Sequence, residues 1–233
     1  MKDAIEKLLP LERDLFFALN GSESVILDNI MWTISGRFVW IPLFLFIIFM
    51  FFYKTPRKTA LLVSLFFILV FVASDQVSSS LFKPLFERFR PTHHPDFMNE
   101  VDFLNDYRGG KYGFISGHAT NSFGLAVFMS LIFRYRWITV TSLLWATLNS
   151  YTRIYLGVHF ISDIIAGMLM GTILAVILYM GFYAVKKTVL KTENINNGEH
   201  IYTAKSGQVL SIFIIIYILI LTIFSPLLST LPH

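Results

Sequence analysis

The chain has 233 residues, of which 55% are hydrophobic and 15% charged, and its mean hydropathy is +0.63. Because an average soluble domain has about 25% charged residues, this composition excludes a soluble globular protein and indicates an integral membrane protein. The net charge of +4 comes without a basic run interleaved with aromatic residues, so we predict no nucleic-acid partner, and the absence of cysteine excludes disulfides, thiol catalysis and zinc–cysteine sites.

Residues 1–20 mix apolar and charged side chains and are too polar to cross a bilayer. They also lack the basic-then-apolar order of a cleaved signal sequence. We therefore predict an interfacial amphipathic helix over residues 1–20. The alternative is a short soluble helix that packs on a loop.

Six apolar stretches then predict six transmembrane helices, so the expected fold is an all-α, polytopic membrane protein in which residues 1–233 form a single domain. A break at Ser35-Gly36-Arg37 interrupts the first stretch. A membrane helix takes about 20 residues, so the third and fourth stretches are short and should border a polar site. The stretches cover about residues 25–53, 59–82, 118–133, 137–151, 160–185 and 209–228.

The basic residues between these stretches predict the orientation, because Lys and Arg accumulate in cytoplasmic loops. Three alternate loops share such residues: Lys54, Arg57, Lys58, Arg134, Arg136, Lys186, Lys187, Lys191 and Lys205. We therefore expect the N-terminus, the loop of residues 83–117 and the C-terminus on the periplasmic or extracellular side. Cations also occur in that outer loop, against the bias, which indicates that they bind an anion locally: Lys83, Arg88, Arg90, Arg108 and Lys111.

Lys83 and Arg90 are seven residues apart, which is two helical turns, so both should project from one face at the outer end of the second span. Two fixed cations at one place suit a phosphate group. The alternative is a pair of interfacial residues that snorkel to water. Arg88 is assigned to that alternative, with its charge paired to Glu87 or in water.

Ser116-Gly117-His118 leads directly into the third span. Ser116 is predicted as the N-cap, which would leave the amides of Gly117 and His118 free to bind an anion at the helix end. His118 would add a proton donor at the same place. Taken alone, the tripeptide is weak evidence and favours a structural histidine over a catalytic one.

His159 and Asp163 are four residues apart, so on a helix they would lie one turn from each other, where a carboxylate can hold an imidazole N–H. Arg153 precedes them, and Gly157 offers a bend in the chain. Asp75, inside the second span, needs a partner, and we expect it to support Lys83 or Arg153 or to contact the substrate.

Three segments together resemble the signature of the type 2 phosphatidic acid phosphatase family, in its bacterial membrane-bound branch: Lys83 with six residues to Arg90-Pro91, Ser116-Gly117-His118, and Arg153 with five residues to His159 and three to Asp163. That family also includes glucose-6-phosphatase, bacterial acid phosphatases and vanadium haloperoxidases. Two positions depart from the usual pattern. Ile115 stands where proline commonly precedes Ser-Gly-His, and Thr152 stands where serine is usual but keeps a hydroxyl that can donate to phosphate.

The resemblance implies that His159 attacks phosphorus to form a phosphohistidine, that Asp163 orients His159, and that His118 protonates the leaving oxygen. It implies no metal and no cofactor, because fixed cations and helix amides neutralise the phosphate. The implied phosphate-binding residues are Lys83, Arg90, Ser116, Gly117 and Arg153, with Asp75 and Thr152 as candidate supporting residues.

The expected function is removal of a terminal phosphate from a lipid phosphate or diphosphate at the outer face of the bacterial cytoplasmic membrane. Undecaprenyl diphosphate or lipid A is the favoured substrate, and phosphatidylglycerol phosphate or phosphatidic acid is the alternative. A lipid-binding or flipping protein and a vanadate-dependent haloperoxidase are the other hypotheses.

The loop of residues 93–112 should lie over the pocket and select the head group. Its adjacent histidines, His93 and His94, are interpreted as part of a solvated acidic loop rather than a metal site. The oligomeric state stays open.

Overall fold

The computed structural model describes residues 5–189 and 201–231. Regular structure in these ranges is helical, apart from an isolated bridge between Phe89 and Tyr112. The α-helices are α2 (Leu9–Leu19), α3 (Val25–Ser35), α4 (Ile41–Phe52), α5 (Arg57–Gln76), α6 (Lys83–Phe86), α7 (Gly117–Phe133), α8 (Arg136–Tyr155), α9 (Ile161–Val189), α10 (Ala204–Ile223) and α11 (Ser225–Leu228). A π-helical segment (Val77–Phe82) joins α5 to α6, and short 3-10 turns cover Phe38–Trp40 and Pro91–His93.

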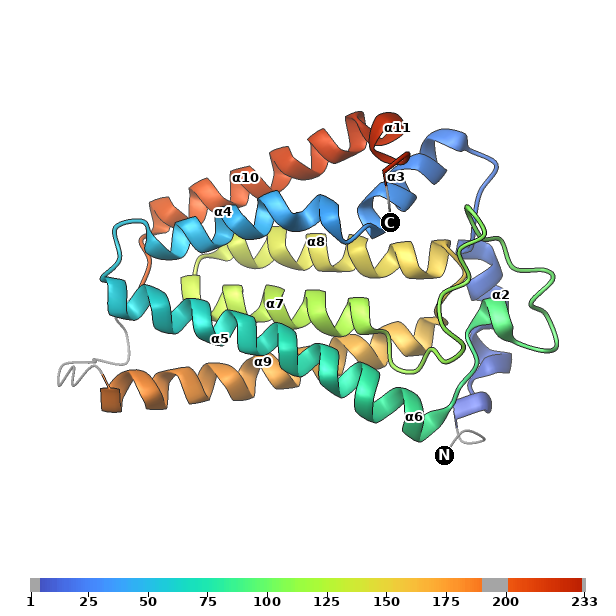
Figure 1. Cartoon of the computed structure of the whole chain (residues 1–233), viewed down its shortest axis with the longest axis horizontal. Helices are drawn as coiled ribbons and strands as arrows, with labels where there is room; N and C mark the ends of the chain where they lie inside the picture. The colour runs from blue at the N-terminus through green and yellow to red at the C-terminus, as the bar shows by residue number, and fades with distance from the viewer. Residues whose placement is uncertain (1–4, 190–200, 232–233) are drawn as a thin grey trace.

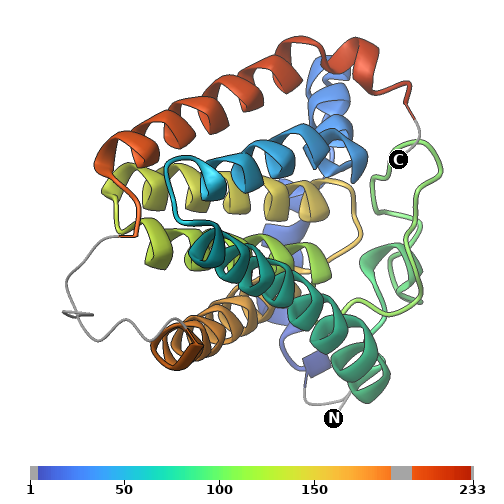
Figure 2. The same ribbon diagram turned by 60° about the vertical axis from the view of Figure 1, so that its left-hand side comes forward.

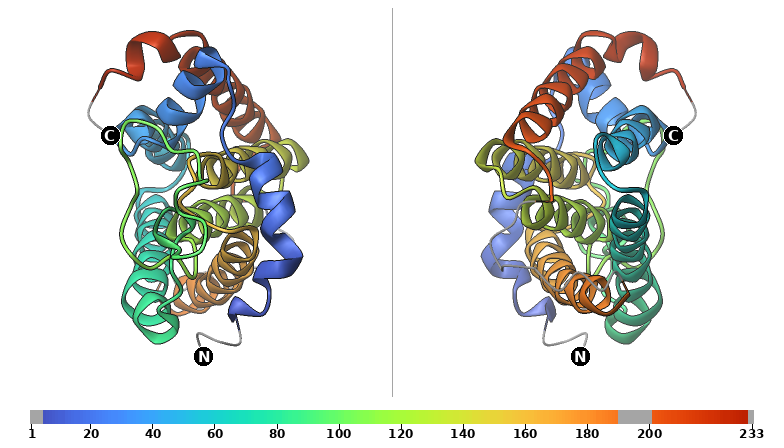
Figure 3. Two further views of the ribbon diagram at one scale, coloured as in Figure 1. Left: turned by 90° about the vertical axis from the view of Figure 1, so that its right-hand side faces the viewer. Right: turned by 90° about the vertical axis from the view of Figure 1, so that its left-hand side faces the viewer.

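The long helices run side by side, and α2 lies across one end of the bundle (Figure 1). Helices α7 and α8 are central, with α10 and α4 on one side and α9 on the other (Figure 2). Segment 87–116 covers the same end as α2, as the end-on view shows (Figure 3, left). The turns that join α4 to α5 and α7 to α8 lie at the opposite end (Figure 1).

Three helical segments in the described chain are long and apolar enough to cross a membrane: Arg57–Phe86, Ile161–Thr188 and Ala204–Ile223. The pair Val25–Ser35 and Phe38–Phe52, bent by 72°, makes a fourth if it counts as one span. The predicted break in the first span is therefore present. Helix α7 is shorter and α8 is more polar, so the count of six spans stays a prediction.

Two glycines on α9 let it approach α7 closely. A side chain at Gly171 would put its Cβ 2.2 Å from the carbonyl oxygen of Thr120, and one at Gly167 would come 2.7 Å from the carbonyl oxygen of Ser116. The two glycines are four residues apart, which is the small-residue spacing that packs membrane helices against each other. This contact brings the start of α9 beside the start of α7, where the Ser116 amide donates to the Asp163 carbonyl at 3.0 Å.

The N-terminal segment forms a helix, as predicted, over Leu9–Leu19. Its Phe16 is fully buried, and the ring packs 5.4 Å from Phe160 beside the start of α9. Leu11 and Leu15 on the same helix are exposed. The helix is therefore integrated into the protein, and its position at a membrane interface stays a prediction.

Candidate active site

The predicted site residues meet at the end of the bundle covered by α2 and by segment 87–116. A cavity of about 530 Å³ opens there, within the 300–1,000 Å³ typical of small-molecule sites. Seven of the predicted residues line it, contributed by α5, α6, α7, α8 and two connecting segments: Asp75, Lys83, Arg90, Gly117, His118, Arg153 and His159.

His159 and Asp163 are in contact, although His159 lies in the segment before α9 and not on the helix as predicted. The His159 Nδ1 is 3.4 Å from Asp163 Oδ2, which also accepts a hydrogen bond from the Phe160 amide at 3.0 Å. The turn is made by Gly157, whose φ of 69° is the left-handed conformation that favours glycine. Asp163 therefore contacts both the His159 ring and the backbone of the segment that precedes α9.

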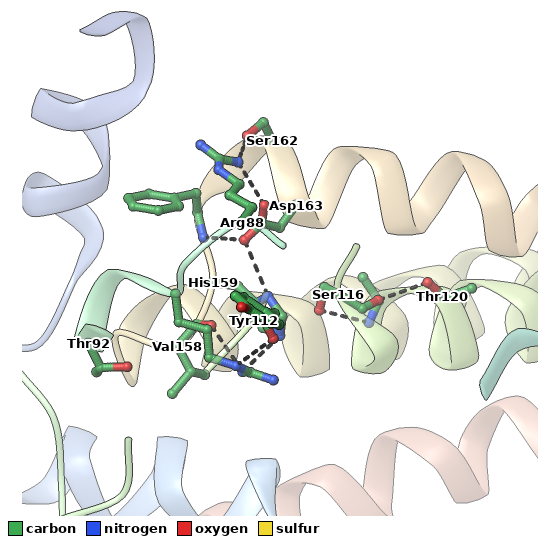
Figure 4. A network of polar contacts seen from close by, with 12 residues as sticks. Arg88, Thr92, Tyr112, Ser116, Thr120, Val158, His159, Ser162 and Asp163 are labelled. Atoms are coloured by element: carbon green, nitrogen blue, oxygen red, sulfur yellow. Dashed lines mark hydrogen bonds and ion pairs between the residues drawn. The ribbon is translucent and has the colours of Figure 1, made fainter. Parts of the chain in front are cut away.

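Arg88, assigned from the sequence to an exposed role, is fully buried, and that assignment is wrong. Its guanidinium donates to Asp163 Oδ1 at 2.7 Å (Figure 4). It also donates to Glu12 Oε1 at 2.6 Å. Glu12 also accepts from the amide and the hydroxyl of Ser162, at 2.7 and 2.8 Å. The sequence alone did not show this, because Glu12 on α2 contacts Arg88 only in the folded protein. A buried cation such as Arg88 needs carboxylate partners of this kind.

Arg90 reaches the site from a loop and not from a helix. The second span ends at Phe86, because Glu87 has a φ of 46°, so the expected two helical turns to Arg90 do not form. The Arg90 Nε donates to the Tyr112 carbonyl at 3.2 Å, and Nη1 donates to the Val158 carbonyl at 3.0 Å. The same Nη1 lies 3.2 Å from His159 Nε2. Lys83 and Arg90 both line the cavity, as predicted, but they reach it from a helix and a loop instead of from one helix face.

Arg153, on the last turn of α8, is buried and held from two sides. It donates to the hydroxyl of Ser35, at the break in the first span, and to the Tyr107 hydroxyl at 2.8 Å. Its Nε has no hydrogen-bond partner within the described protein, which leaves one donor for a ligand. Arg37, next to the break, also lines the cavity and is close enough for its charge to act on Arg153.

Ser116 is the N-cap of α7, as predicted, and accepts from the Ala119 amide at 3.4 Å. It is fully buried and does not line the cavity, whereas Gly117 and His118 do. Thr152 is also fully buried, and its hydroxyl donates to the Asn149 carbonyl at 2.7 Å instead of reaching the cavity. Neither hydroxyl lines the cavity, so the phosphate contact expected of Ser116 and the supporting role expected of Thr152 stay predictions.

His118 faces the cavity from the first turn of α7, and the Ser35 backbone serves as a hydrogen-bond partner for its ring. Asp75 lines the same cavity and is close enough to Lys83 for its charge to act on that amine, and its supporting role stays a prediction. The broken first span thus contacts both the predicted acid and Arg153.

Burial, followed by the positive charges of Arg90 and Arg153, lowers the pKa of His159 well below its usual value. The imidazole is therefore neutral at physiological pH. With Nδ1 facing the Asp163 carboxylate and Nε2 facing a guanidinium donor, the tautomer that fits protonates Nδ1 and leaves the Nε2 lone pair for nucleophilic attack. Burial and the charge of Arg153 lower the pKa of Arg90 to about 10, so it stays cationic.

Three residues of this site escaped the sequence reasoning: Glu12, Ser35 and Arg88. Tyr107 lies in the loop that was predicted to cover the pocket. Arg88 had a signal, because it is a cation in an outer loop where few are expected. Among the described residues no group of three or more His, Asp or Glu side chains is placed to hold a metal ion. Whether the chemistry needs a metal stays a prediction.

Residues 62–187 match the PAP2 superfamily. The chain is 47% identical over 175 residues to a lipid A 4'-phosphatase of Porphyromonas gingivalis, an alignment that covers 75% of this chain and 74% of that protein. It is 36% identical over 168 residues to a lipid A 4'-phosphatase of Bacteroides thetaiotaomicron, covering 72% and 75%. It is 29% identical over 162 residues to an undecaprenyl-diphosphatase of Sulfolobus acidocaldarius, covering 68% and 72%.

Among solved structures, the fold is similar to that of a transmembrane PAP2-type phosphatidylglycerolphosphate phosphatase from Bacillus subtilis. The TM-score is 0.58 at 24% identity, and the superposition covers 82% of this chain and 90% of that one. At this identity the likeness establishes the shared fold.

Proposed function

The chain belongs to the PAP2 superfamily and is a membrane lipid phosphatase, and we propose that it removes a terminal phosphate from lipid A through a phosphohistidine on His159. One observation carries this proposal: a single cavity holds the neutral imidazole of His159 together with Lys83, Arg90 and Arg153. The similarity to two lipid A 4'-phosphatases supports the choice of lipid.

In the proposed first step, the Nε2 of His159 attacks phosphorus while the bond from phosphorus to the lipid oxygen breaks. His118 donates a proton to that leaving oxygen. In the second step, water attacks the phosphohistidine, and His118 takes the proton from the water. Inorganic phosphate leaves and His159 returns to its neutral form, while Asp163 stabilises the positive charge that develops on the ring.

The cations act on the charge of the transition state. Arg90 already lies 3.2 Å from the nucleophilic nitrogen, so a phosphoryl oxygen bound by its guanidinium would place phosphorus beside Nε2. The free Nε of Arg153, Lys83 and the Gly117 amide at the start of α7 would neutralise the other oxygens. Ser116 keeps a supporting role in this scheme, as the cap of α7.

Undecaprenyl diphosphate is the second candidate, because the Sulfolobus relative is named for it and the same cations suit a diphosphate. Phosphate release from purified protein with lipid A, undecaprenyl diphosphate, phosphatidylglycerol phosphate and phosphatidic acid decides between them. His159→Ala should release no phosphate from any lipid, and Lys205→Ala, at the opposite end of the bundle, is the control. Wild-type release from His159→Ala contradicts the mechanism, and bound lipid without hydrolysis by the wild type would favour a lipid carrier.

We further propose that α3–α4, α5–α6, α7, α8, α9 and α10 are six spans of a single domain comprising residues 1–233, in the cytoplasmic membrane of a bacterium, with residues 1–20 at the interface. The side-by-side arrangement of these helices supports the count (Figure 1). The site would face the periplasm, because the basic turns around Lys58 and Arg136 lie at the opposite end.

The chain has no cysteine, so one introduced cysteine reports this topology without background. In intact spheroplasts, a membrane-impermeant maleimide should label Glu100→Cys and should label Lys58→Cys only after lysis. Both native side chains are exposed. The reverse pattern would place the site on the cytoplasmic side.

A further inference from the structure

The cavity extends along the bundle beyond the phosphate-binding residues. Asn121 follows His118 by three residues on α7, and Asn149 precedes Arg153 by four on α8. With a rise of about 1.5 Å per residue, each amide lies about one helical turn, roughly 5 Å, further from the covered end of the bundle. Trp145 is one turn further along α8. All three line the cavity that contains His159, so they lie where the group attached to the scissile phosphate would be.

These side chains carry polar atoms that no protein group satisfies. Trp145 Nε1, Asn149 Oδ1 and Asn121 Oδ1 are buried and have no hydrogen-bond partner within the described protein. Trp145 is 3% exposed and Asn149 is 7% exposed. Unpaired polar groups are costly at membrane depth and are tolerated where they line a cavity that receives a polar partner.

Neighbouring polar residues on α8 behave differently. Ser142 and Ser150 are buried in the same helix, and their hydroxyls donate to the carbonyls of Ile138 and Ala146 at 2.6 and 2.7 Å. A buried polar side chain of α8 can therefore be satisfied by its own backbone. The tryptophan N–H and the asparagine amide oxygens that remain unpaired in the cavity wall are available to a ligand.

Aromatic rings complete the wall. The Trp145 ring lies 5.7 Å from Trp40 and 6.1 Å from Phe44, and all three line the cavity. The Trp40 Nε1 donates to the Ile34 carbonyl at 2.9 Å, which leaves Trp145 as the indole with an unused N–H among these two. Apolar ring faces next to amide groups match a pyranose, which has apolar C–H faces and a rim of hydroxyl and amide groups.

We propose that Asn121, Trp145 and Asn149 form a subsite that binds the sugar of the leaving group, so that the preferred substrate is a phosphorylated glycolipid. This inference rests on the proposed function of the same cavity. In undecaprenyl diphosphate the group next to the scissile phosphate is a second phosphate, which can accept from the Trp145 N–H but offers no donor to the two asparagine oxygens, and the polyprenyl chain beyond it offers no hydrogen bonds. A site built to hydrogen-bond a ligand discriminates strongly against an analogue that lacks the partner groups.

The test compares kcat/KM for lipid A with kcat/KM for undecaprenyl diphosphate, using the full-length protein and the variants Asn149→Leu, Asn121→Leu and Trp145→Phe. Each variant removes hydrogen-bonding groups at similar size. We expect the ratio of the two kcat/KM values to fall by about tenfold in each variant. Ser150→Ala, which removes a buried hydroxyl from the same helix outside the cavity, should leave the ratio unchanged.

An equal loss of kcat/KM for both lipids would mean that these residues only pack the bundle, and no loss for either lipid would mean that water alone satisfies them; either result overturns the inference. Measuring lipid binding through the Tm makes the test independent of catalytic turnover. In a His159→Ala background, lipid A should raise the Tm, and adding Asn149→Leu should reduce that shift while the shift caused by undecaprenyl diphosphate stays the same. If the wild type hydrolyses neither lipid, the proposed function fails, and this binding comparison still decides the subsite.

Discussion

Arg88 and Asp163 form an ion pair of 2.7 Å in which both side chains are fully buried. The pair occupies one carboxylate oxygen of Asp163, and the other oxygen faces His159 and the Phe160 amide. Glu12 lies on the far side of Arg88 at 2.6 Å. His159, the proposed nucleophile, is thus held through two buried side chains by a helix that lies more than a hundred residues earlier in the chain.

The first prediction concerns this connection. Removing one partner of a buried ion pair costs about 3–5 kcal/mol, so Arg88→Met should lower the Tm and reduce kcat strongly. Glu12→Gln keeps an oxygen that can accept from Arg88, and we expect a smaller loss. The control is Arg13→Ala on the same helix, because the ion pair of Arg13 with Glu100, at 3.8 Å, is exposed. An Arg88→Met variant with wild-type Tm and kcat would show that the pair does not position the site.

Arg153 and its partner Tyr107 give a second prediction. Loss of one transition-state donor typically costs about 2.7–4 kcal/mol, so Arg153→Ala should lower kcat by two to three orders of magnitude. Tyr107→Phe removes only the 2.8 Å contact that positions the guanidinium, and we expect a loss of about tenfold. Steady-state phosphate release measures both. A larger loss for Tyr107→Phe than for Arg153→Ala would contradict these roles.

The pH profile gives a third prediction. Since the pKa of His159 lies well below its usual value, its imidazole stays unprotonated as the pH falls through 6.5. The acid limb of kcat/KM should therefore lie at a lower pH than for an ordinary histidine. Arg90→Gln removes a positive charge that lowers this pKa, so the limb should move to higher pH even though overall activity drops. If the acid limb of the Arg90→Gln variant stays at the wild-type pH, the charge of Arg90 does not lower the pKa of His159.

A fourth prediction addresses metals and vanadate. Because fixed cations and helix amides are assigned to the phosphoryl oxygens, phosphate release should be the same with and without EDTA. Orthovanadate should inhibit competitively, since it would bind the same cations. Loss of activity in EDTA that returns on adding a divalent metal would overturn the metal-free scheme. Bromide oxidation by the vanadate-loaded protein would support the haloperoxidase hypothesis.

The contact between α7 and α9 gives a fifth prediction. Gly171→Ala would drive its Cβ to 2.2 Å from a backbone oxygen, so the helices must separate, at a cost of about 1–3 kcal/mol. We expect a lower Tm and reduced kcat, because the contact aligns α7, which carries His118, with α9, which begins directly after the segment of His159. Gly181→Ala on the same helix meets Phe66 at an ordinary 3.4 Å and serves as the matched control. Equal Tm values for the two variants would contradict the argument.

Much of the site could be predicted because its residues lie in short segments whose geometry is local. The Ser116 cap depends on a few consecutive residues, and the contact of His159 with Asp163 spans a single turn. The prediction failed in detail where a helix was assumed but the chain leaves the helix. Lys83 and Arg90 share the cavity, but the chain leaves the helix at Glu87 and Arg90 arrives from a loop.

The sequence by itself determined the class of protein, the membrane setting and the motif residues, because hydropathy and spacing are properties of neighbouring residues. Only the tertiary structure decided what surrounds them: Glu12 behind Arg88, Ser35 against Arg153, and the unpaired amide of Asn149 in the cavity wall. The first two contacts join residues 76 and 118 positions apart. Such contacts depend on how the helices pack and on where the first span bends, which no local pattern of residues encodes.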